Sequence, residues 1–329
     1  MKILITGGAG YIGSHVAKAL LEANRHDVVI LDNLCKGSLR AIEALRDVGE
    51  FEFVQESLEN TPAIEKLFKR EKFDAIIHFA AFIEVFESTQ NPLKYYLNNT
   101  ANAMNLIALA KKYGVKDFIF SSTAATYGEP DIPQVSEETP QNPINPYGRS
   151  KLMVEWVLKD AAAANPNFKY GILRYFNVAG AASDGTIGQN YPNATHLIKV
   201  ATQTIVGKRD KMSIFGDDYD TKDGTCIRDY IHVEDLASAH LAVLDYLQSG
   251  DSAVFNVGYG TGFSVKEVVN EAKKVSGVDF KVEIAPRRAG DPACLISNAD
   301  KIRTKTSWQP EHESLDEIIL SALNWEKKL

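Results

Sequence analysis

The sequence predicts an α/β fold built on a doubly wound parallel sheet, with a smaller α/β part toward the C-terminal end. Short apolar segments alternate with longer helical segments through the first half of the 329-residue chain, and this alternation is typical of parallel sheets covered by helices. A glycine-rich turn follows the first apolar segment directly. After Arg174 the alternation gives way to loops rich in Gly, Asn and Asp, which indicates a second structural part.

Six apolar segments have the length of buried strands: residues 2–6, 28–31, 51–54, 75–79, 118–121 and 170–174. Helical periodicity is found between them at 11–24, 63–71, 92–113 and 147–164, with stops such as Tyr113-Gly114 and Asn165-Pro166. The crossovers should be right-handed. Beyond Arg174, shorter strands and helices are expected around Ile214 and through 231–247, 254–257, 265–275 and 315–325.

Composition excludes several classes of protein. The formal net charge is -7 and Lys and Arg form no stripe, so we expect no nucleic-acid partner. No segment approaches the roughly 20 apolar residues of a membrane span, so we expect no membrane partner. Cys35, Cys226 and Cys294 are odd in number and lack histidines at zinc-ligand spacing, which favours a cytoplasmic protein with no disulfide framework and no metal site.

The glycine turn has the context of a dinucleotide-binding fingerprint. Gly7-x-x-Gly10-x-x-Gly13 follows an expected strand and opens an expected helix, where small residues and free N–H groups allow a pyrophosphate to approach. The alternative is a tight turn with no ligand. Asp32 ends the next expected strand, where a carboxylate accepts hydrogen bonds from a ribose and repels a 2′-phosphate, so NAD is favoured over NADP. Asp32 could also simply form the turn.

Two further strand ends lie at the edge where such sheets bind ligands. One carries His78-Phe79-Ala80-Ala81, whose small residues would line a cofactor crevice; His78 itself is expected to be a packed structural residue. The other carries Thr123, a hydroxyl that could hydrogen-bond a substrate. The expected fold is therefore a Rossmann sheet.

Tyr147 and Lys151 are spaced i and i+4, so they share one face of an expected helix. The Lys151 ammonium can favour the phenolate and lower the pKa of Tyr147 from about 10, which would make a base near neutral pH. Such a pair is usually a solvated helix face, and Ser/Thr clusters at strand ends are usually turn formers. The order of glycine turn, Asp, strand-end Thr and Tyr-x-x-x-Lys favours a redox enzyme instead.

These motifs resemble those of the extended short-chain dehydrogenases/reductases, and specifically the UDP-glucose 4-epimerases, including the type that also accepts UDP-N-acetylglucosamine. The similar segments are residues 6–15, 32–34, 121–128, 146–151, 174–180, 228–233 and 287–291. The resemblance implies that NAD takes a hydride from C4 of a UDP-hexose while Tyr147 removes the O4 proton. The resulting 4-keto sugar would rotate about its link to the UDP and be reduced on its opposite face.

The resemblance also implies a division of the chain and a homodimer. Residues 1–176 would form the NAD-binding Rossmann domain, with 227–258 returning to it, and residues 177–226 and 259–329 the UDP-sugar-binding domain. Helices 92–113 and 147–164 would pair with their counterparts in a four-helix bundle. UDP-hexoses and UDP-N-acetylhexosamines would be the substrates.

Site residues follow from the same resemblance. The catalytic residues would be Thr123, Tyr147 and Lys151. Those binding NAD would be Gly7, Gly10, Tyr11, Ile12, Gly13, Asp32, Asn33, Ser57, Leu58, Phe79, Ala80, Ala81, Asn98, Ser121, Tyr147, Lys151 and Tyr175. Those binding substrate would be Thr123, Asn177, His196, Leu197, Phe215, Arg228, Tyr230, Arg288, Asp291 and Leu295.

Within that set, Asn177, Arg228 and Arg288 would meet the diphosphate, since a guanidinium matches phosphate oxygens. Phe215 would lie along the uracil or ribose, and Asp291 near the ribose hydroxyls. For the two arginines, the alternative is a surface ion pair.

Four residues depart from the most familiar members of the family. Ser57 replaces an Asp and Ile83 a Lys near the cofactor, so fewer polar contacts would hold NAD. His196 replaces an Asn facing the sugar, and Leu295 replaces a larger Tyr near C2 of the hexose. A wider pocket that accepts N-acetylated substrates is therefore expected.

Three alternatives stay open from the residues alone. A nucleotide-sugar 4,6-dehydratase would need an acid and a base after the strand-end Thr, where this chain has Ala124 and Ala125. A keto-sugar reductase would consume free NAD(P)H. A non-catalytic NAD-sensing protein could dispense with the Tyr/Lys pair.

Overall fold

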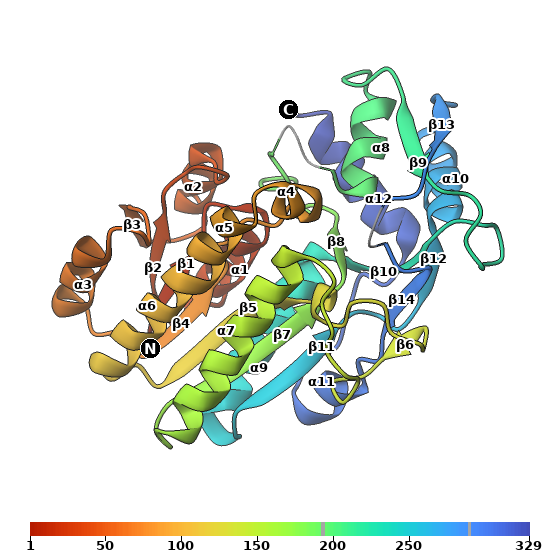
Figure 1. The fold of residues 1–329 in the computed structure, drawn as a ribbon. Helices are drawn as coiled ribbons and strands as arrows, with labels where there is room; N and C mark the ends of the chain where they lie inside the picture. Colours follow the sequence, from red (N-terminus) through yellow and green to blue (C-terminus); the bar gives the residue numbers. More distant parts are fainter. Residues whose placement is uncertain (192–194, 289–290) are drawn as a thin grey trace.

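The computed structural model describes residues 1–191, 195–288 and 291–329. Its centre is a parallel sheet of seven strands in the order β11-β7-β5-β4-β1-β2-β3 (Figure 1). The strand order reverses at β1, as in doubly wound dinucleotide-binding folds. The strands are β1 (Lys2–Thr6), β2 (Asp27–Asp32), β3 (Glu52–Gln55), β4 (Ala75–His78), β5 (Asp117–Thr123), β7 (Lys169–Tyr175) and β11 (Ala253–Val257).

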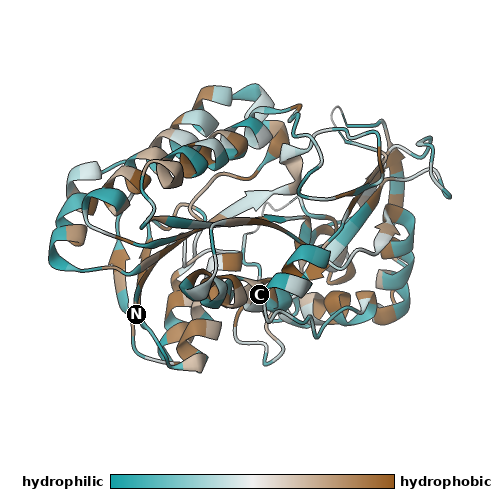
Figure 2. Cartoon of the chain, turned by 90° about the horizontal axis from the view of Figure 1, so that it is seen from below, coloured by the Kyte–Doolittle hydropathy of each residue, from teal (hydrophilic) through white to brown (hydrophobic). Residues whose placement is uncertain are grey.

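Helices cover both faces of this sheet, and alternate strand residues supply a core to each. Ile3 and Ile5 of β1 pack into one core, and Leu4 between them packs into the other. Figure 2, which shows the sheet nearly edge-on, displays mostly apolar strands between helical layers. Helices α1 (Tyr11–Ala23), α2 (Leu39–Arg46) and α9 (Val233–Ser249) contribute to the first core, and α3 (Thr61–Arg70), α6 (Asn102–Lys112) and α7 (Pro146–Ala163) to the second.

The expected helix at 92–113 is interrupted by a wide turn. It consists of α5 (Pro92–Tyr95), a π-helical turn η1 (Tyr96–Ala101) and α6, and the short helix α4 (Val85–Gln90) precedes it. Side chains of the π turn bond to neighbouring segments: Asn99 Nδ2 donates to the Phe82 carbonyl at 2.9 Å and to Ser150 Oγ at 3.1 Å. These tertiary contacts explain the local widening, which sequence periodicity does not encode.

A second group of elements packs beside the carboxyl ends of the sheet (Figure 1). Strand β10 (Ile227–His232) is its centre, paired in parallel with β8 (Asn177–Ala179) and β14 (Cys294–Ser297) and antiparallel with β12 (Gly262–Ser264). Strand β14 also pairs with β6 (Gln134–Val135), and β9 (Met212–Phe215) pairs with β13 (Val282–Ala285). The helices here are α8 (Leu197–Ile205), α10 (Val265–Ser276) and α12 (Leu315–Glu326), whereas α11 (Asp300–Lys305) packs against β11 and the first core.

The expected α/β fold is confirmed, with small differences at element ends. Strand β5 extends two residues beyond the expected 118–121 and places Thr123 as its last residue, before the 3-10 turn η2 (Ala124–Thr126). The expected segment at 231–247 is the end of β10 followed by α9. Residues 289–290 of the 287–291 motif lie outside the described part. Among the helices described, none is long and apolar enough to cross a membrane.

Candidate active site

The glycine turn between β1 and α1 is built for close approach of backbone groups. Gly7 has a φ of +73°, and a Cβ there would lie 2.7 Å from the Ala80 nitrogen. A Cβ on Gly13 would lie 2.3 Å from the Gly7 carbonyl oxygen. The turn leads into the first turn of α1, where the N–H groups of Tyr11 and Ile12 have no acceptor within the helix. A ligand phosphate fits this end of the helix.

Asp32 ends β2 beside the glycine turn, and β1 places both at one edge of the sheet. Its carboxylate accepts hydrogen bonds from the Ala9 N–H at 3.0 Å and the Leu34 N–H at 2.7 Å. Asp32 therefore does form the turn, and it also fixes the glycine loop. Burial raises the Asp32 pKa, and these two backbone bonds oppose that rise. The Asn33 side chain accepts from the Cys35 N–H at 3.0 Å.

The other expected cofactor residues occupy varied positions. Ser57 Oγ accepts from the Glu59 N–H at 3.3 Å in the turn after β3, and Leu58 is buried in the core. Phe79 and the two alanines follow β4, which neighbours β1. The Asn98 side chain donates to Asn99 Oδ1 at 2.9 Å, and the Tyr11 hydroxyl donates to the Gly180 carbonyl at 2.7 Å.

His78 is a packed structural residue, as expected. Its Nδ1 lies 2.6 Å from Thr6 Oγ1, its ring stacks on Phe120, and burial lowers its pKa to about 3. The ring therefore stays neutral and belongs to the sheet interior.

Tyr147 lies buried in the first turn of α7. Asn145 caps this helix by accepting the Gly148 N–H at 2.8 Å, which fixes the turn that carries the phenol. The Tyr147 hydroxyl lies near the Thr123 hydroxyl at the end of β5. Burial raises the Tyr147 pKa to about 12, although the neighbouring Thr123 hydroxyl lowers it. The expected lowering of this pKa is therefore not found in this arrangement, because loss of solvation dominates.

Lys151 lies one helical turn further along, almost fully buried. Its ammonium donates to the Ser121 carbonyl at 2.8 Å and lies 4.9 Å from the centroid of the Phe120 ring. Burial lowers the Lys151 pKa to about 7. Ser121 Oγ also meets the Tyr175 hydroxyl. The structure thus brings Ser121, Thr123, Tyr147, Lys151 and Tyr175 together at the ends of β5 and β7.

A buried ion pair supports this group and was not expected from the sequence. Glu155, one turn after Lys151, accepts from Arg174 Nη2 at 2.6 Å, from Arg174 Nε at 3.0 Å and from Ser122 Oγ at 2.5 Å. Arg174 also donates to the Tyr127 hydroxyl at 2.9 Å. The pair fastens α7 to β5 and β7. An arginine inside an apolar strand was the available signal, since such a charge requires a buried partner.

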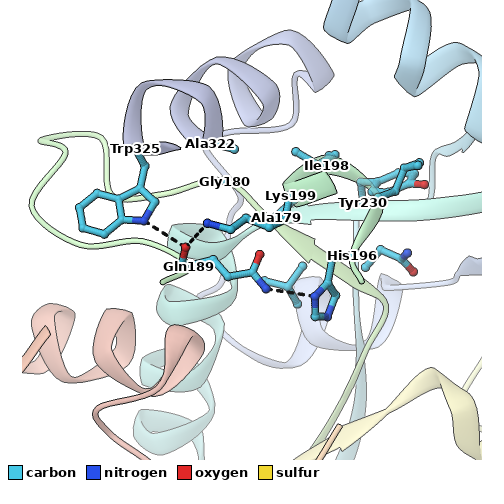
Figure 3. Close-up of a pocket in the computed structure, with 12 residues that line it drawn as sticks. Ala179, Gly180, Gln189, His196, Ile198, Lys199, Tyr230, Ala322 and Trp325 are labelled. Carbon is cyan, nitrogen blue, oxygen red and sulfur yellow. Dashed lines mark hydrogen bonds between the residues drawn. The ribbon is translucent and has the colours of Figure 1, made fainter. Parts of the chain in front are cut away.

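Four of the expected substrate residues line one cavity between β8, β10, α8 and α12: Asn177, His196, Leu197 and Tyr230. Figure 3 shows the Gln189 amide meeting His196, at 3.0 Å from Nδ1. It also shows Lys199 Nζ and Trp325 Nε1 converging on the Gln189 carbonyl, at 2.5 Å and 3.2 Å. Lys199 pairs with buried Glu326 at 2.5 Å. Gln189, Lys199 and Trp325 had no motif that could have identified them.

The remaining substrate residues lie around β9, β10 and β14. The Arg288 guanidinium stacks 3.6 Å from the centroid of Phe215. Arg228 lies 3.7 Å from the Asp291 carboxylate, so it does form the ion pair considered as an alternative. Leu295 is opposite Arg228 on the paired strand and packs in a small cluster with Ala124, Tyr127 and Val135.

Comparison with known proteins decides the family. The model of the NAD dependent epimerase/dehydratase family matches residues 3–258. This chain belongs to that family.

Individual members of the NAD dependent epimerase/dehydratase family resemble this chain along its whole length. A UDP-glucose 4-epimerase of Azospirillum brasilense is 49% identical over 329 residues, which are 100% of this chain and 92% of that protein. The solved UDP-Glc/GlcNAc 4-epimerase of Campylobacter jejuni is 65% identical with a TM-score of 0.88, covering 100% of this chain and 99% of that one. The UDP-glucose 4-epimerase of Bifidobacterium longum, solved with NAD+ and UDP, is 37% identical with a TM-score of 0.96, covering 100% and 98%. The predicted resemblance to UDP-glucose 4-epimerases and the predicted dependence on NAD are confirmed.

Proposed function

We propose that this chain is a UDP-hexose 4-epimerase that interconverts UDP-glucose and UDP-galactose and also acts on UDP-N-acetylglucosamine and UDP-N-acetylgalactosamine. The observation that carries the proposal is the placement of the Thr123 and Tyr147 hydroxyls close together at the sheet edge that also carries the glycine turn. The two residues after Thr123 are Ala124 and Ala125. Methyl groups transfer no protons, so water elimination is disfavoured.

The glycine turn and Asp32 fit NAD. The close packing of Gly13 on Gly7 brings the first turn of α1 against the glycine loop, where its N–H groups can meet the pyrophosphate, and the Asp32 carboxylate suits ribose hydroxyls. Gly7, Gly10, Tyr11, Ile12 and Asn33 would complete this part of the site. Ser57, Leu58, Phe79, Ala80, Ala81 and Asn98 would line the adenosine and nicotinamide portions. Bound NAD supplies the oxidant that takes up the C4 hydrogen and returns it.

The chain's own residues handle the proton on O4. Thr123 would hydrogen-bond the sugar hydroxyl and Tyr147 would accept its proton, because the two hydroxyls lie close together. Phenolate formation in a buried site needs a nearby cation, and the Lys151 ammonium one turn away supplies it when protonated. Ser121 holds that ammonium in place through its carbonyl. Tyr147 then returns the proton to the opposite epimer.

The nucleotide would be held beside β9, β10 and β14. Arg228 and Arg288 would bind the diphosphate, with their present partners Asp291 and Phe215 released toward the ribose and uracil. His196, Leu197 and Tyr230 line the neighbouring cavity and would face the sugar end, and Asn177, which lines the same cavity, would meet the diphosphate. We propose residues 177–226 and 259–329 as the substrate-binding part and 1–176 with 227–258 as the NAD-binding part; β10, which carries Arg228 and Tyr230, lies with the substrate-binding part.

Acceptance of N-acetylated sugars rests on Leu295. This side chain packs beside Ala124, the residue after the catalytic threonine, so its size sets the width of the pocket near the reacting carbon. A tyrosine there would fill that space. Leu295→Tyr should remove activity on UDP-N-acetylgalactosamine and keep activity on UDP-galactose. Wild-type enzyme that leaves UDP-N-acetylgalactosamine unchanged at long incubation would contradict the wider pocket.

We propose a homodimer through the helices at the front of Figure 1. Large apolar side chains are exposed on α4, α5, η1, α6 and α7: Phe86, Leu93, Leu97, Met104 and Trp156. An exposed apolar surface of this extent marks a protein interface. Trp156→Glu should yield monomers in light scattering. Ile132→Glu, at an apolar residue of similar exposure in the loop before β6, should leave the dimer intact.

Three free cysteines, one of them exposed, support a reducing, cytoplasmic location. UDP-sugars as ligands are consistent with the clustered Arg228 and Arg288.

Tyr147→Phe tests the central assignment. Removal of the general base should lower kcat by about 10²–10⁴-fold with UDP-galactose, while bound NAD is retained. Epimerisation near the wild-type rate would refute the assigned base. Product analysis without added cofactor separates the alternatives: a dehydratase forms a 4-keto-6-deoxy sugar, a reductase needs stoichiometric NAD(P)H, and a sensing protein forms no product.

A further inference from the structure

Three side chains with metal-ligating atoms meet at the start of α9, outside the proposed active site. His232 ends β10 and caps α9, Glu234 lies in the first turn of α9, and His312 lies in the segment before α12. One ligand atom from each lies within 4.8 Å of the others. Glu234 Oε2 is 3.9 Å from His232 Nδ1 and 3.7 Å from His312 Nε2. Residues distant in sequence thus converge on one point.

The His312 imidazole is held with Nε2 toward that point. His312 Nδ1 lies 2.5 Å from the Glu317 carboxylate, so Nδ1 carries a proton, and Nε2 would bind a metal once it is deprotonated. His232 Nδ1 accepts the Glu234 N–H at 3.2 Å, and its Nε2 lies 3.1 Å from Ser321 Oγ. Metal-ligating histidines typically donate their other N–H to a carboxylate or hydroxyl in this way.

The backbone that carries the three ligands is fixed by a buried carboxylate. Asp235 accepts from the Glu311 N–H at 2.8 Å and from the His312 N–H at 2.9 Å. The Tyr259 hydroxyl donates to Asp235 at 2.5 Å. Since Asp235 is the neighbour of Glu234, the two segments are held in one register. Such support is what a preorganised metal site requires.

We propose that His232, Glu234 and His312 bind a divalent transition-metal ion, with Zn²⁺ the best match, and that water takes the fourth position. Zn–ligand bonds of about 2.0–2.1 Å in a tetrahedron place ligand atoms about 3.3 Å apart. The observed 3.7 Å and 3.9 Å would shorten by a few tenths of an ångström, and the two histidine nitrogens, which lie within 4.8 Å of each other, would also approach. Two imidazoles disfavour Ca²⁺ and Mg²⁺, which prefer oxygen ligands.

Solvent access is compatible with binding, and the ion would displace the Ser183 hydroxyl from the Glu234 carboxylate. The Glu234 and His312 side chains are 25% and 22% exposed, so an ion and its water can enter from solvent. The ion replaces the long Glu234 N–H contact to His232, and a first-turn N–H can turn to water instead. The bound ion would link the start of α9 to the segment leading into α12. It would stabilise the folded state, because the site does not exist in the unfolded chain.

Binding of Zn²⁺ and Co²⁺ to the NAD-containing enzyme tests the proposal. Calorimetry should show one Zn²⁺ site per chain, and Co²⁺ should give the strong visible absorption of a four-coordinate ion. His312→Ala should abolish the site, and Glu317→Gln should weaken it by about 10-fold or more because the imidazole loses its orienting partner. His26→Ala, a histidine outside the cluster, should bind like the wild type.

Zn²⁺ binding that is unchanged by His312→Ala, or absent from the wild type, would overturn the proposal. Both variants keep the buried His232 and are expected to fold, which circular dichroism and retained epimerase activity would verify. Since the cluster shares no residue with the proposed active site, failure of the metal site would not contradict the proposed epimerase function, and failure of the epimerase function would not contradict the metal site.

Discussion

Lys151→Met tests whether the buried lysine opposes folding. The side chain is 2% exposed, and burial lowers its pKa from 10.5 to about 7. Since one pKa unit corresponds to about 1.36 kcal/mol, this burial destabilises the folded state by about 4 kcal/mol at pH 7. Methionine has similar length and no charge, but it loses the bond to the Ser121 carbonyl, about 1 kcal/mol. We therefore expect the variant to be more stable by about 3 kcal/mol and to lose epimerase activity.

The stability difference between the wild type and Lys151→Met should also depend on pH. The unfolded chain binds the lysine proton more tightly than the folded chain between pH 7 and about 10.5, so wild-type stability should rise with pH across that window. The advantage of Lys151→Met should shrink over the same range.

Urea unfolding at pH 7 and pH 9, on protein freed of NAD and with NAD restored, measures both effects. Lys159→Met, at a more exposed lysine of the same helix, serves as the control and should change little. A Lys151→Met protein that is less stable than the wild type at pH 7, or whose advantage does not vary with pH, would refute the reasoning.

Two further substitutions test other parts of the site. Gly13→Ala places a Cβ 2.3 Å from the Gly7 carbonyl; the purified protein should contain far less NAD by absorbance, whereas an unchanged NAD content would exclude the tight cradle. Glu155→Ala leaves the Arg174 guanidinium buried without its partner and should reduce the free energy of unfolding by about 3–5 kcal/mol in urea; a loss below 1 kcal/mol, on the order of a surface ion pair, would contradict the importance of this buried pair.

The layered fold could be predicted because its signals are local. Apolar runs such as 2–6 and the glycine turn after them identify a strand and its ligand-binding end without knowledge of the rest of the chain. The π turn at Tyr96–Ala101 could not be predicted, because it accompanies hydrogen bonds from Asn99 to Phe82 and Ser150, which are distant in sequence. Helix α2, Leu39–Arg46, was missed because its short amphipathic pattern lies in a polar stretch.

The site divides in the same way. The placement of Thr123 at a strand end and of Tyr147 and Lys151 on one helical turn could be predicted, because each depends only on spacing within a single element. The Tyr147 pKa was predicted in the wrong direction for this arrangement, because burial by segments distant in sequence outweighs its helical neighbour. Glu155 and Arg174 come together only through tertiary structure, so no motif links them.

The position of β11 affects how substrate choice can change over time. This edge strand pairs with β7, yet the chain reaches it only after passing through β8, β9, β10 and α9. A contiguous stretch that carries both the cavity residues between 177 and 230 and Leu295 therefore contains β11, and exchanging that stretch with a relative's would also replace the edge strand of the sheet. An isolated replacement in the pocket avoids this, and Leu295 is the position where we propose that such a replacement would act.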